Sequence, residues 1–229
     1  MNQTFAEMLE RNADHATEFA DRFDDVQDAQ YPDAVTVCCS DSRVLQDGMW
    51  GNDEPGDLFS VGNIGNRVVQ RTTDGEAVSG DVLYPIAHTG TETAVVVGHT
   101  GCGAVTATYD ALTGDADGGS EPAGIEHCIG LLEPDLEPGV EALPDGLDRA
   151  EAINRLVEYN VDRQVDRLTD SDDVPATVDV VGAVYDFQDV YSDRRGEVHV
   201  VNVGGETDPD RLRDDHPEVA DRIDRLWTY

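Results

Sequence analysis

Short apolar segments that alternate with helical patterns constrain the fold of this chain most strongly. Residues 34–38 and 94–97 are runs of small and β-branched side chains, too short for a buried helix. Such runs are typical of strands that are buried on both faces of a parallel sheet. We therefore expect an α/β fold, with a mostly parallel β-sheet and flanking helices that cover both of its faces. The expected strands are 34–38, 58–61, 94–97, 178–184 and 198–203.

Apolar residues that recur every three or four positions predict the helices of the chain. The first helix, over residues 4–26, carries Phe5, Met8 and Phe19 on one face. Further helices are expected over 75–89, 104–112, 125–132, 150–168 and, at the C-terminus, 219–226. Because no linker divides the chain, we expect a single domain over 1–229, with a helical arm at 1–30 and an acidic surface excursion at 114–146.

The balance of charge is extreme. The chain has 49 Asp and Glu residues against 15 basic residues, all of them Arg, which gives a formal net charge of −34. High net charge can indicate disorder, but the apolar periodicity argues for a folded chain. So acidic a surface repels nucleic acid and anionic lipid, and neither is expected as a partner. We interpret the acidity as adaptation to concentrated salt, as in a halophilic archaeon. We expect a cytoplasmic protein, because no signal segment or membrane span is visible.

Two of the expected strands end in residues that bind metals. Cys39 follows the run 34–38, and His99 and Cys102 follow the run 94–97. Ligands of parallel sheets bind at the carboxyl ends of the strands, so these three side chains meet if the two strands are neighbours. Two Cys and one His leave one position of a zinc tetrahedron for water. The alternative is a set of buried thiols and a core histidine, but three such residues at two strand ends favour zinc.

Four segments resemble the β-class carbonic anhydrases: CSDSRV at 39–44, PGDLF at 55–59, NIGN at 63–66 and GHTGCG at 98–103. The resemblance implies reversible hydration of carbon dioxide to bicarbonate and a proton by zinc-bound hydroxide. It implies one Zn²⁺ per chain, held by Cys39, His99 and Cys102. It also implies a homodimer, or a larger oligomer built from dimers.

The same resemblance implies roles for residues around the metal. Asp41 would accept a hydrogen bond from the zinc-bound hydroxide, and a bidentate pair with Arg43 would hold Asp41 off the metal. Without the surrounding motif, Asp41 would be read as a helix N-cap beside a solvated Arg. Substrate-binding positions are implied for Gln30, which would act across a dimer interface, for a pocket tyrosine and for the lining of a small apolar pocket. These positions are Gln30, Val44, Phe59, Ile64, Tyr84 and Gly103.

Two positions depart from the family's common pattern. Gly62 stands where relatives commonly carry an Arg that in some of them helps to bind inhibitory bicarbonate, and Leu83 replaces an acidic residue. We therefore expect an open zinc site, with Asp41 paired to Arg43. Two other functions stay open at this point: hydrolysis of carbonyl sulfide or carbon disulfide on the same fold, and a non-catalytic zinc or thiol sensor that uses Cys38 and Cys39.

Overall fold

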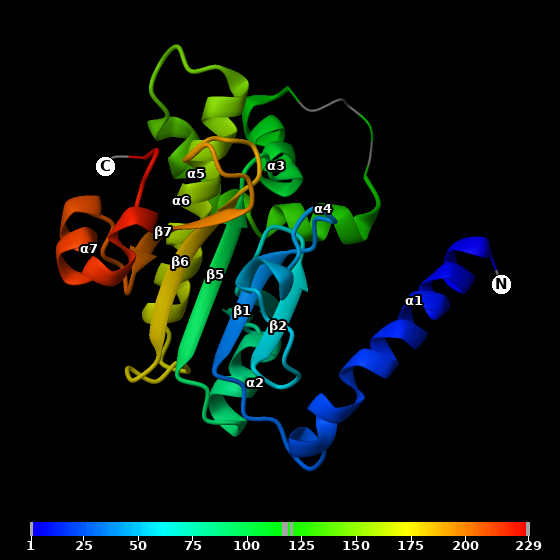
Figure 1. The fold of residues 1–229 in the computed structure, drawn as a ribbon. Coiled ribbons are helices and arrows are strands. Elements are labelled where there is room, and N and C mark those ends of the chain that lie inside the picture. Colours follow the sequence, from blue (N-terminus) through cyan, green and yellow to red (C-terminus); the bar gives the residue numbers. More distant parts are fainter. Residues whose placement is uncertain (1, 116–118, 120, 228–229) are drawn as a thin grey trace.

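A five-stranded sheet in the order β2-β1-β5-β6-β7 forms the centre of the computed structural model (Figure 1). The structure describes residues 2–115, 119 and 121–227. Four strands are parallel and β7 runs antiparallel to β6, which confirms the expected mostly parallel sheet. The strands are β1 (Ala34–Cys39), β2 (Leu58–Asn63), β5 (Thr93–His99), β6 (Asp179–Asp186) and β7 (Glu197–Val203).

The register of the parallel strands brings four strand ends together. Cys39, the last residue of β1, is paired with Asn63 at the end of β2. His99, the last residue of β5, is paired with Tyr185 near the end of β6. Because β1 and β5 are neighbours, the loops that follow all four strands meet at one edge of the sheet, where parallel sheets bind their ligands.

The main core lies on one face of the sheet, where two helices contact the strands and two more pack against the longer of these helices. The helices on the strands are α2 (Gly80–His88) and α6 (Arg149–Thr169), and those packed against α6 are α3 (Gly103–Thr113) and α5 (Glu133–Ala142). A capping box between Asp148 and Glu151 begins α6. The helix then approaches the sheet closely, because a Cβ atom at Gly98 would lie 2.8 Å from Val161. Gly98 therefore sets the distance between α6 and the strand that carries His99.

The other face of the sheet is covered by shorter segments. A small cluster of Cys38, Val44, Val97 and Tyr185 lies there, beside the 3-10 helix η2 (Gly48–Trp50). An apolar groove of about 430 Å³ runs next to it. The groove is lined by side chains that include Trp50, Val95, Val181, Val198, Val200 and Val219. The predicted sheet with flanking helices is thus confirmed: long α-helices lie on the first face, whereas the second face carries η2 and the 3-10 helix η3 (Pro217–Arg222), whose Trp50 and Val219 line the groove.

The N-terminal arm projects away from the sheet (Figure 1). It consists of α1 (Gln3–Phe19), which Asn2 caps, and the 3-10 helix η1 (Ala20–Val26). No residue of α1 is buried, and Phe5, Met8 and Leu9 are exposed. The predicted helical segment 4–26 is therefore confirmed, but its last residues, 20–26, form a 3-10 helix instead of an α-helix.

The segment before α2 differs from the prediction. A hairpin of β3 (Val69–Thr72) and β4 (Gly75–Val78) occupies residues that were expected to begin a helix at 75. Gly75 has φ +126°, a conformation that glycine adopts readily and that lies outside the helical region. The helix begins only after Ser79, whose side chain caps it.

The acidic stretch 114–146 contains two helices, of which the sequence predicted one. The expected helix is α4 (Ala123–Gly130), and α5 follows it. Leu132 and Leu136 are fully buried and belong to the main core. Residues 116–118 and 120 of this stretch, like residue 1 of the arm, lie outside the described residues.

The chain ends in α7 (Pro209–Asp215) and the 3-10 helix η3 (Pro217–Arg222). The prediction of a terminal helix through residue 226 is wrong, because Ile223 leaves the helix and forms an isolated β-bridge with Val200. Among the residues that the structure describes, no helix combines the length and the apolar character needed to cross a membrane.

Candidate metal site

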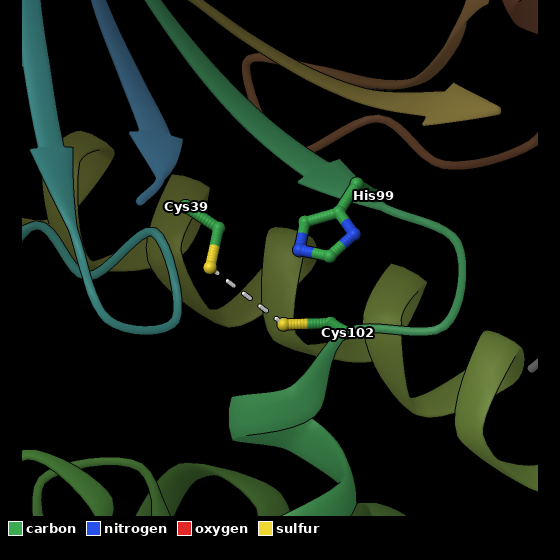
Figure 2. A group of neighbouring side chains, drawn as sticks. All are labelled: Cys39, His99 and Cys102. Atoms are coloured by element: carbon green, nitrogen blue, oxygen red, sulfur yellow. Dashed lines mark hydrogen bonds between the residues drawn. The ribbon is translucent and has the colours of Figure 1, made fainter. Parts of the chain in front are cut away.

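Three buried side chains meet at the carboxyl edge of the sheet (Figure 2). Cys39 comes from the end of β1, His99 from the end of β5, and Cys102 from the residue that precedes α3. Their ligand atoms all lie within 4.8 Å of one another. The three residues that the sequence predicted as zinc ligands are therefore the ones that the fold brings together.

The histidine ring presents one nitrogen to the two thiols. His99 Nδ1 lies 3.0 Å from the carbonyl oxygen of Thr100, and this contact is a hydrogen bond when Nδ1 carries the proton. His99 Nε2 is buried and has no hydrogen-bond partner. A buried polar atom without a partner costs free energy. A metal ion bound to the lone pair of Nε2 would supply the missing partner.

The two thiols are spaced for a tetrahedral metal ion. Their sulfur atoms are 3.9 Å apart. Two sulfurs bound to one zinc at about 2.3 Å each would be about 3.8 Å apart in a tetrahedron. A hydrogen bond from the Cys102 thiol lowers the pKa of Cys39 to about 4, and the same bond together with burial raises the pKa of Cys102. The donor set and its spacing fit zinc, to which cysteine binds as the thiolate.

Backbone geometry around Gly101 makes the approach of Cys102 possible. Gly101 has φ +61° and turns the chain between β5 and α3. Its N–H donates to Asn154 Oδ1 of α6 at 2.9 Å. The backbone N–H groups of Ala104 and Val105, in the first turn of α3, point at the Cys102 sulfur. Helix N-termini favour negative charge, so this turn suits a thiolate ligand.

Asp41 and Arg43 form the bidentate pair that was expected. Arg43 donates from Nε to Asp41 Oδ1 at 2.9 Å and from a terminal nitrogen to Oδ2 at 2.7 Å. The backbone N–H of Arg43 also donates to Oδ1. These hydrogen bonds from Arg43 hold the pKa of Asp41 well below its ordinary value. Asp41 Oδ2 lies 3.9 Å from His99 Nε2, so the carboxylate stands beside the donor cluster while it is bound to Arg43.

Of the substrate-binding positions, Gly103 and Ile64 adjoin the cluster, whereas Val44 packs on the opposite face of the sheet from Cys39. Gly103 follows Cys102 at the start of α3. Ile64, 43% exposed, belongs to the loop after β2, whose Gly65 N–H contacts the Cys39 sulfur. Val44 is buried with Cys38 in the small cluster on the second face of the sheet.

The other three positions lie elsewhere in this chain. Phe59 is four residues before Asn63 on β2, about 13 Å along the strand from the metal edge. Its ring packs 6.2 Å from that of Tyr84, which is 49% exposed on α2. Gln30 is exposed in the segment between η1 and β1. A single chain therefore does not bring Gln30, Phe59 and Tyr84 to the cluster.

Two further residues shape the site and were not predicted. Asn154 fixes the turn at Gly101, as described above. Gln46 covers Gly62, where an added Cβ would lie 2.6 Å from its side-chain nitrogen. A single Asn within a helical pattern and a Gln in a loop carry no sequence signal that would distinguish them from surface residues.

Comparison with known proteins agrees with this geometry. The family model described as carbonic anhydrase matches residues 34–198. A carbonic anhydrase of Helicobacter pylori is 30% identical over 134 residues, which are 58% of this chain and 59% of that protein. One of Mycolicibacterium smegmatis is 31% identical over 139 residues, 60% of this chain and 62% of that protein. These matches thus span about three fifths of each relative's length.

Solved structures share the fold. A tetrameric β-carbonic anhydrase of Sordaria macrospora has a TM-score of 0.72 at 22% identity, over 88% of this chain and 98% of that one. A Coccomyxa β-carbonic anhydrase, solved in complex with acetazolamide, has a TM-score of 0.68 at 22% identity, over 97% of this chain and 98% of that one.

Proposed function

This chain belongs to the β-class carbonic anhydrases, and from that premise we propose that it catalyses the reversible hydration of carbon dioxide to bicarbonate and a proton. One Zn²⁺ per chain would be held by Cys39, His99 and Cys102. The observation that carries the proposal is the buried cluster of two thiols and an unpaired imidazole nitrogen, spaced for one tetrahedral ion.

The zinc site supplies one part of the chemistry, and the protein's side chains supply the rest. When bound, zinc acidifies a water molecule so that it can act as a nucleophile, and the two anionic thiolates make this effect weaker than three neutral imidazoles would. Asp41, whose Oδ2 lies 3.9 Å from His99 Nε2, is placed where it would accept a hydrogen bond from that nucleophile and orient it toward the carbon of CO2. The ligands His99 and Cys102 are almost fully buried, so the surrounding protein keeps bulk water away from them.

Arg43 decides whether the site is open. Its two hydrogen bonds occupy both carboxylate oxygens of Asp41, and this pairing would keep the carboxylate from coordinating the metal. Gly62 provides no guanidinium for a second bicarbonate, and Gln46 fills the space beside it. A buried bicarbonate would there lack a charged partner and would bear its desolvation cost. We expect the rate to depend hyperbolically on CO2 concentration between about pH 7 and 9. A sigmoidal dependence with bicarbonate inhibition would argue for a closed site, in which Asp41 is the fourth ligand of the metal.

A second copy of the chain would complete the substrate pocket. Ile64 and Gly103 would come from the chain that holds the metal, and Gln30, Phe59 and Tyr84 from the partner. Two features support such a dimer. The arm exposes Phe5, Met8 and Leu9 on a helix with no buried residue, and the second face of the sheet carries an apolar groove. Exposed apolar surfaces of this kind mark protein interfaces, and larger oligomers can be built from such dimers.

The excess of acidic residues indicates the kind of solvent in which the protein works. With 49 acidic and 15 basic residues, at least 34 carboxylates have no basic side chain to balance them. We infer a cytoplasm of high ionic strength, as in halophilic archaea, and no nucleic-acid or membrane partner. The acidic surface therefore concerns the solvent, whereas carbon dioxide, a neutral substrate, is unaffected by it.

The sensor alternative has less support. Cys38 and Cys39 point to opposite faces of the sheet and belong to different clusters. Burial raises the pKa of Cys38 to about 12, which leaves its thiol protonated and unreactive. A thiol switch needs an accessible, acidic cysteine, and Cys38 is neither.

Stopped-flow measurement of CO2 hydration in molar KCl tests the proposed function. The purified protein should be active, lose activity when a chelator removes zinc, and regain it when zinc is returned. Carbonyl sulfide is assayed in parallel. Zinc-loaded protein that hydrolyses carbonyl sulfide but does not hydrate CO2, or that does neither, would contradict the proposal.

A further inference from the structure

An aromatic ring outside the predicted site contacts both the histidine ligand and the arginine. Phe187 is the first residue after β6. Its ring stacks on that of His99, with centroids 5.6 Å apart and an angle of 23° between the planes. The guanidinium carbon of Arg43 lies 4.7 Å from the centroid of the same ring. This distance is within the range of a cation–π contact.

The backbone holds Phe187 in this place through Asp186. Asp186 is fully buried and accepts hydrogen bonds from the N–H groups of Gln188, Val190 and Tyr191, each at 2.8 or 2.9 Å. The Thr100 hydroxyl donates to Asp186 Oδ1 and accepts from the N–H of Phe187 at 3.2 Å. The backbone of Phe187 is therefore tied to the residue that follows His99, which places the side chain beside the metal site.

The Asp41–Arg43 pair needs such support. The side chain of Arg43 is 50% exposed, and exposed ion pairs are individually weak because water competes for both partners. A third contact, from Arg43 to the carbonyl oxygen of Gly101, is long at 3.3 Å. The ring of Phe187 supplies a flat surface against which the guanidinium can lie while Nε and one of its two terminal nitrogens face Asp41.

We propose that Phe187 is a positioning residue: its ring orients the guanidinium of Arg43 and so keeps Asp41 away from the metal, while it stacks on the ligand His99. The proposal rests on the proposed function for its catalytic consequence, but the contact itself can be measured without activity. If the ring were absent, Arg43 would release Asp41 more often. Asp41 would then coordinate the metal in a fraction of the molecules, which would be closed to substrate.

Replacing the ring while keeping an apolar side chain tests this role. Phe187→Leu should retain one zinc per chain and lower kcat about two- to fivefold, the range expected for a cation–π contact at a partly exposed site. The KM for CO2 should stay unchanged, because closed molecules do not take part. Phe187→Tyr keeps the ring and should retain the original kcat. Asp189→Asn removes the ion pair to Arg195 from the same loop and is the matched control, expected to be unaltered.

Two further measurements separate positioning from general packing. In the Arg43→Ala background, Phe187→Leu should lower kcat less than in the original protein, because the guanidinium on which the ring acts is gone. The Nε–H proton of Arg43, assigned by its loss in Arg43→Ala, should show an upfield ring-current shift in NMR spectra that disappears in Phe187→Leu. This shift is measured whether or not the protein hydrates CO2.

Several results would overturn the proposal. They are an unchanged kcat in Phe187→Leu, an equal loss in the two backgrounds, or an Arg43 Nε–H without a ring-current shift in the unaltered protein. If Phe187→Leu does not fold, the ring-current shift in the unaltered protein is the measurement that tests the proposal. An inactive unaltered protein with a shifted Arg43 resonance would instead refute the hydratase function and leave the contact established.

Discussion

Arg43 holds the Asp41 carboxylate in one of two places that it could occupy. Arg43→Ala should free Asp41 to bind the metal, because the bidentate hydrogen bonds disappear and the nearest cationic partner becomes the metal itself. We expect CO2 hydration to fall by at least about tenfold, the loss of roughly one charge-assisted hydrogen bond, with zinc still at one per chain. Kinetics together with metal analysis measure both quantities.

Arg211→Ala is a control for that experiment, since Arg211 forms an exposed ion pair with Glu206 elsewhere on the surface. This control should keep full activity. A crystal structure of Arg43→Ala with Asp41 still off the metal, and activity near that of the original protein, would show that Arg43 does not have this role.

At the scale of single residues, the sequence predicted the metal ligands better than their supports. Cys39, His99 and Cys102 follow buried strands, and the rule that strand ends meet at one sheet edge was enough to place them. Asn154 and Phe187 could not be predicted in the same way. An Asn among helical residues and a Phe after a strand are both common, and only the folded chain shows which backbone group or ring each one contacts.

Among the elements, α6 fixes the C-terminal segment through a buried carboxylate. Glu158 accepts hydrogen bonds from the Tyr191 hydroxyl at 2.6 Å and from the N–H groups of Leu226 and Trp227 at 2.7 and 2.8 Å. One turn later, Asp162 pairs with Arg225 in a fully buried salt bridge. Burial raises the pKa of Glu158 from its ordinary 4.5 to about 7.

This raised pKa predicts a pH dependence of stability with a definite sign. The folded state binds the Glu158 proton more tightly than the unfolded state does, so its contribution is present in full below about pH 4.5 and is lost as the pH rises to about 7. The free energy of unfolding, relative to that of Glu158→Gln, should therefore fall between about pH 5 and pH 8. A decrease on the order of 3 kcal/mol corresponds to this shift.

Urea unfolding in molar KCl at the two pH values gives that difference, and the subtraction removes the titration of all other groups. Glu141→Gln, at an exposed position on α5, should show no such change. If the original protein and Glu158→Gln differed by the same amount at both pH values, Glu158 would not titrate in this range.

Helices and strands with a clear apolar periodicity were predicted correctly, whereas elements whose start or end depends on single residues were not. The long apolar stripe of α6 and the short runs of β1 and β5 were correctly predicted. The β3–β4 hairpin was not, because its two strands have only four residues each, too few to show an alternation. The end of the chain was predicted as helix because Val219, Ile223 and Leu226 have helical spacing, but Ile223 pairs with β7 instead.

For the whole molecule, the net charge of −34 predicts that the fold depends on salt. The Debye length is about 10 Å at 0.1 M salt and about 3 Å at 1 M, so surface carboxylates repel one another far more strongly in dilute salt. A loss of about 3 kcal/mol on dilution would lower Tm by roughly 10 °C in a chain of this size. Thermal unfolding across a series of KCl concentrations measures it. A Tm that is the same in molar and in tens of millimolar KCl would exclude salt adaptation.

The central claim is that Cys39, and not its neighbour Cys38, holds the zinc ion that makes this chain a hydratase. The most direct measurement is zinc content per chain together with CO2 hydration in Cys39→Ser and Cys38→Ser. The account predicts that Cys38→Ser keeps one zinc and its activity, because Cys38 lies on the opposite face of the sheet, and that Cys39→Ser loses both. Full zinc and activity in Cys39→Ser, with loss of both in Cys38→Ser, would contradict it.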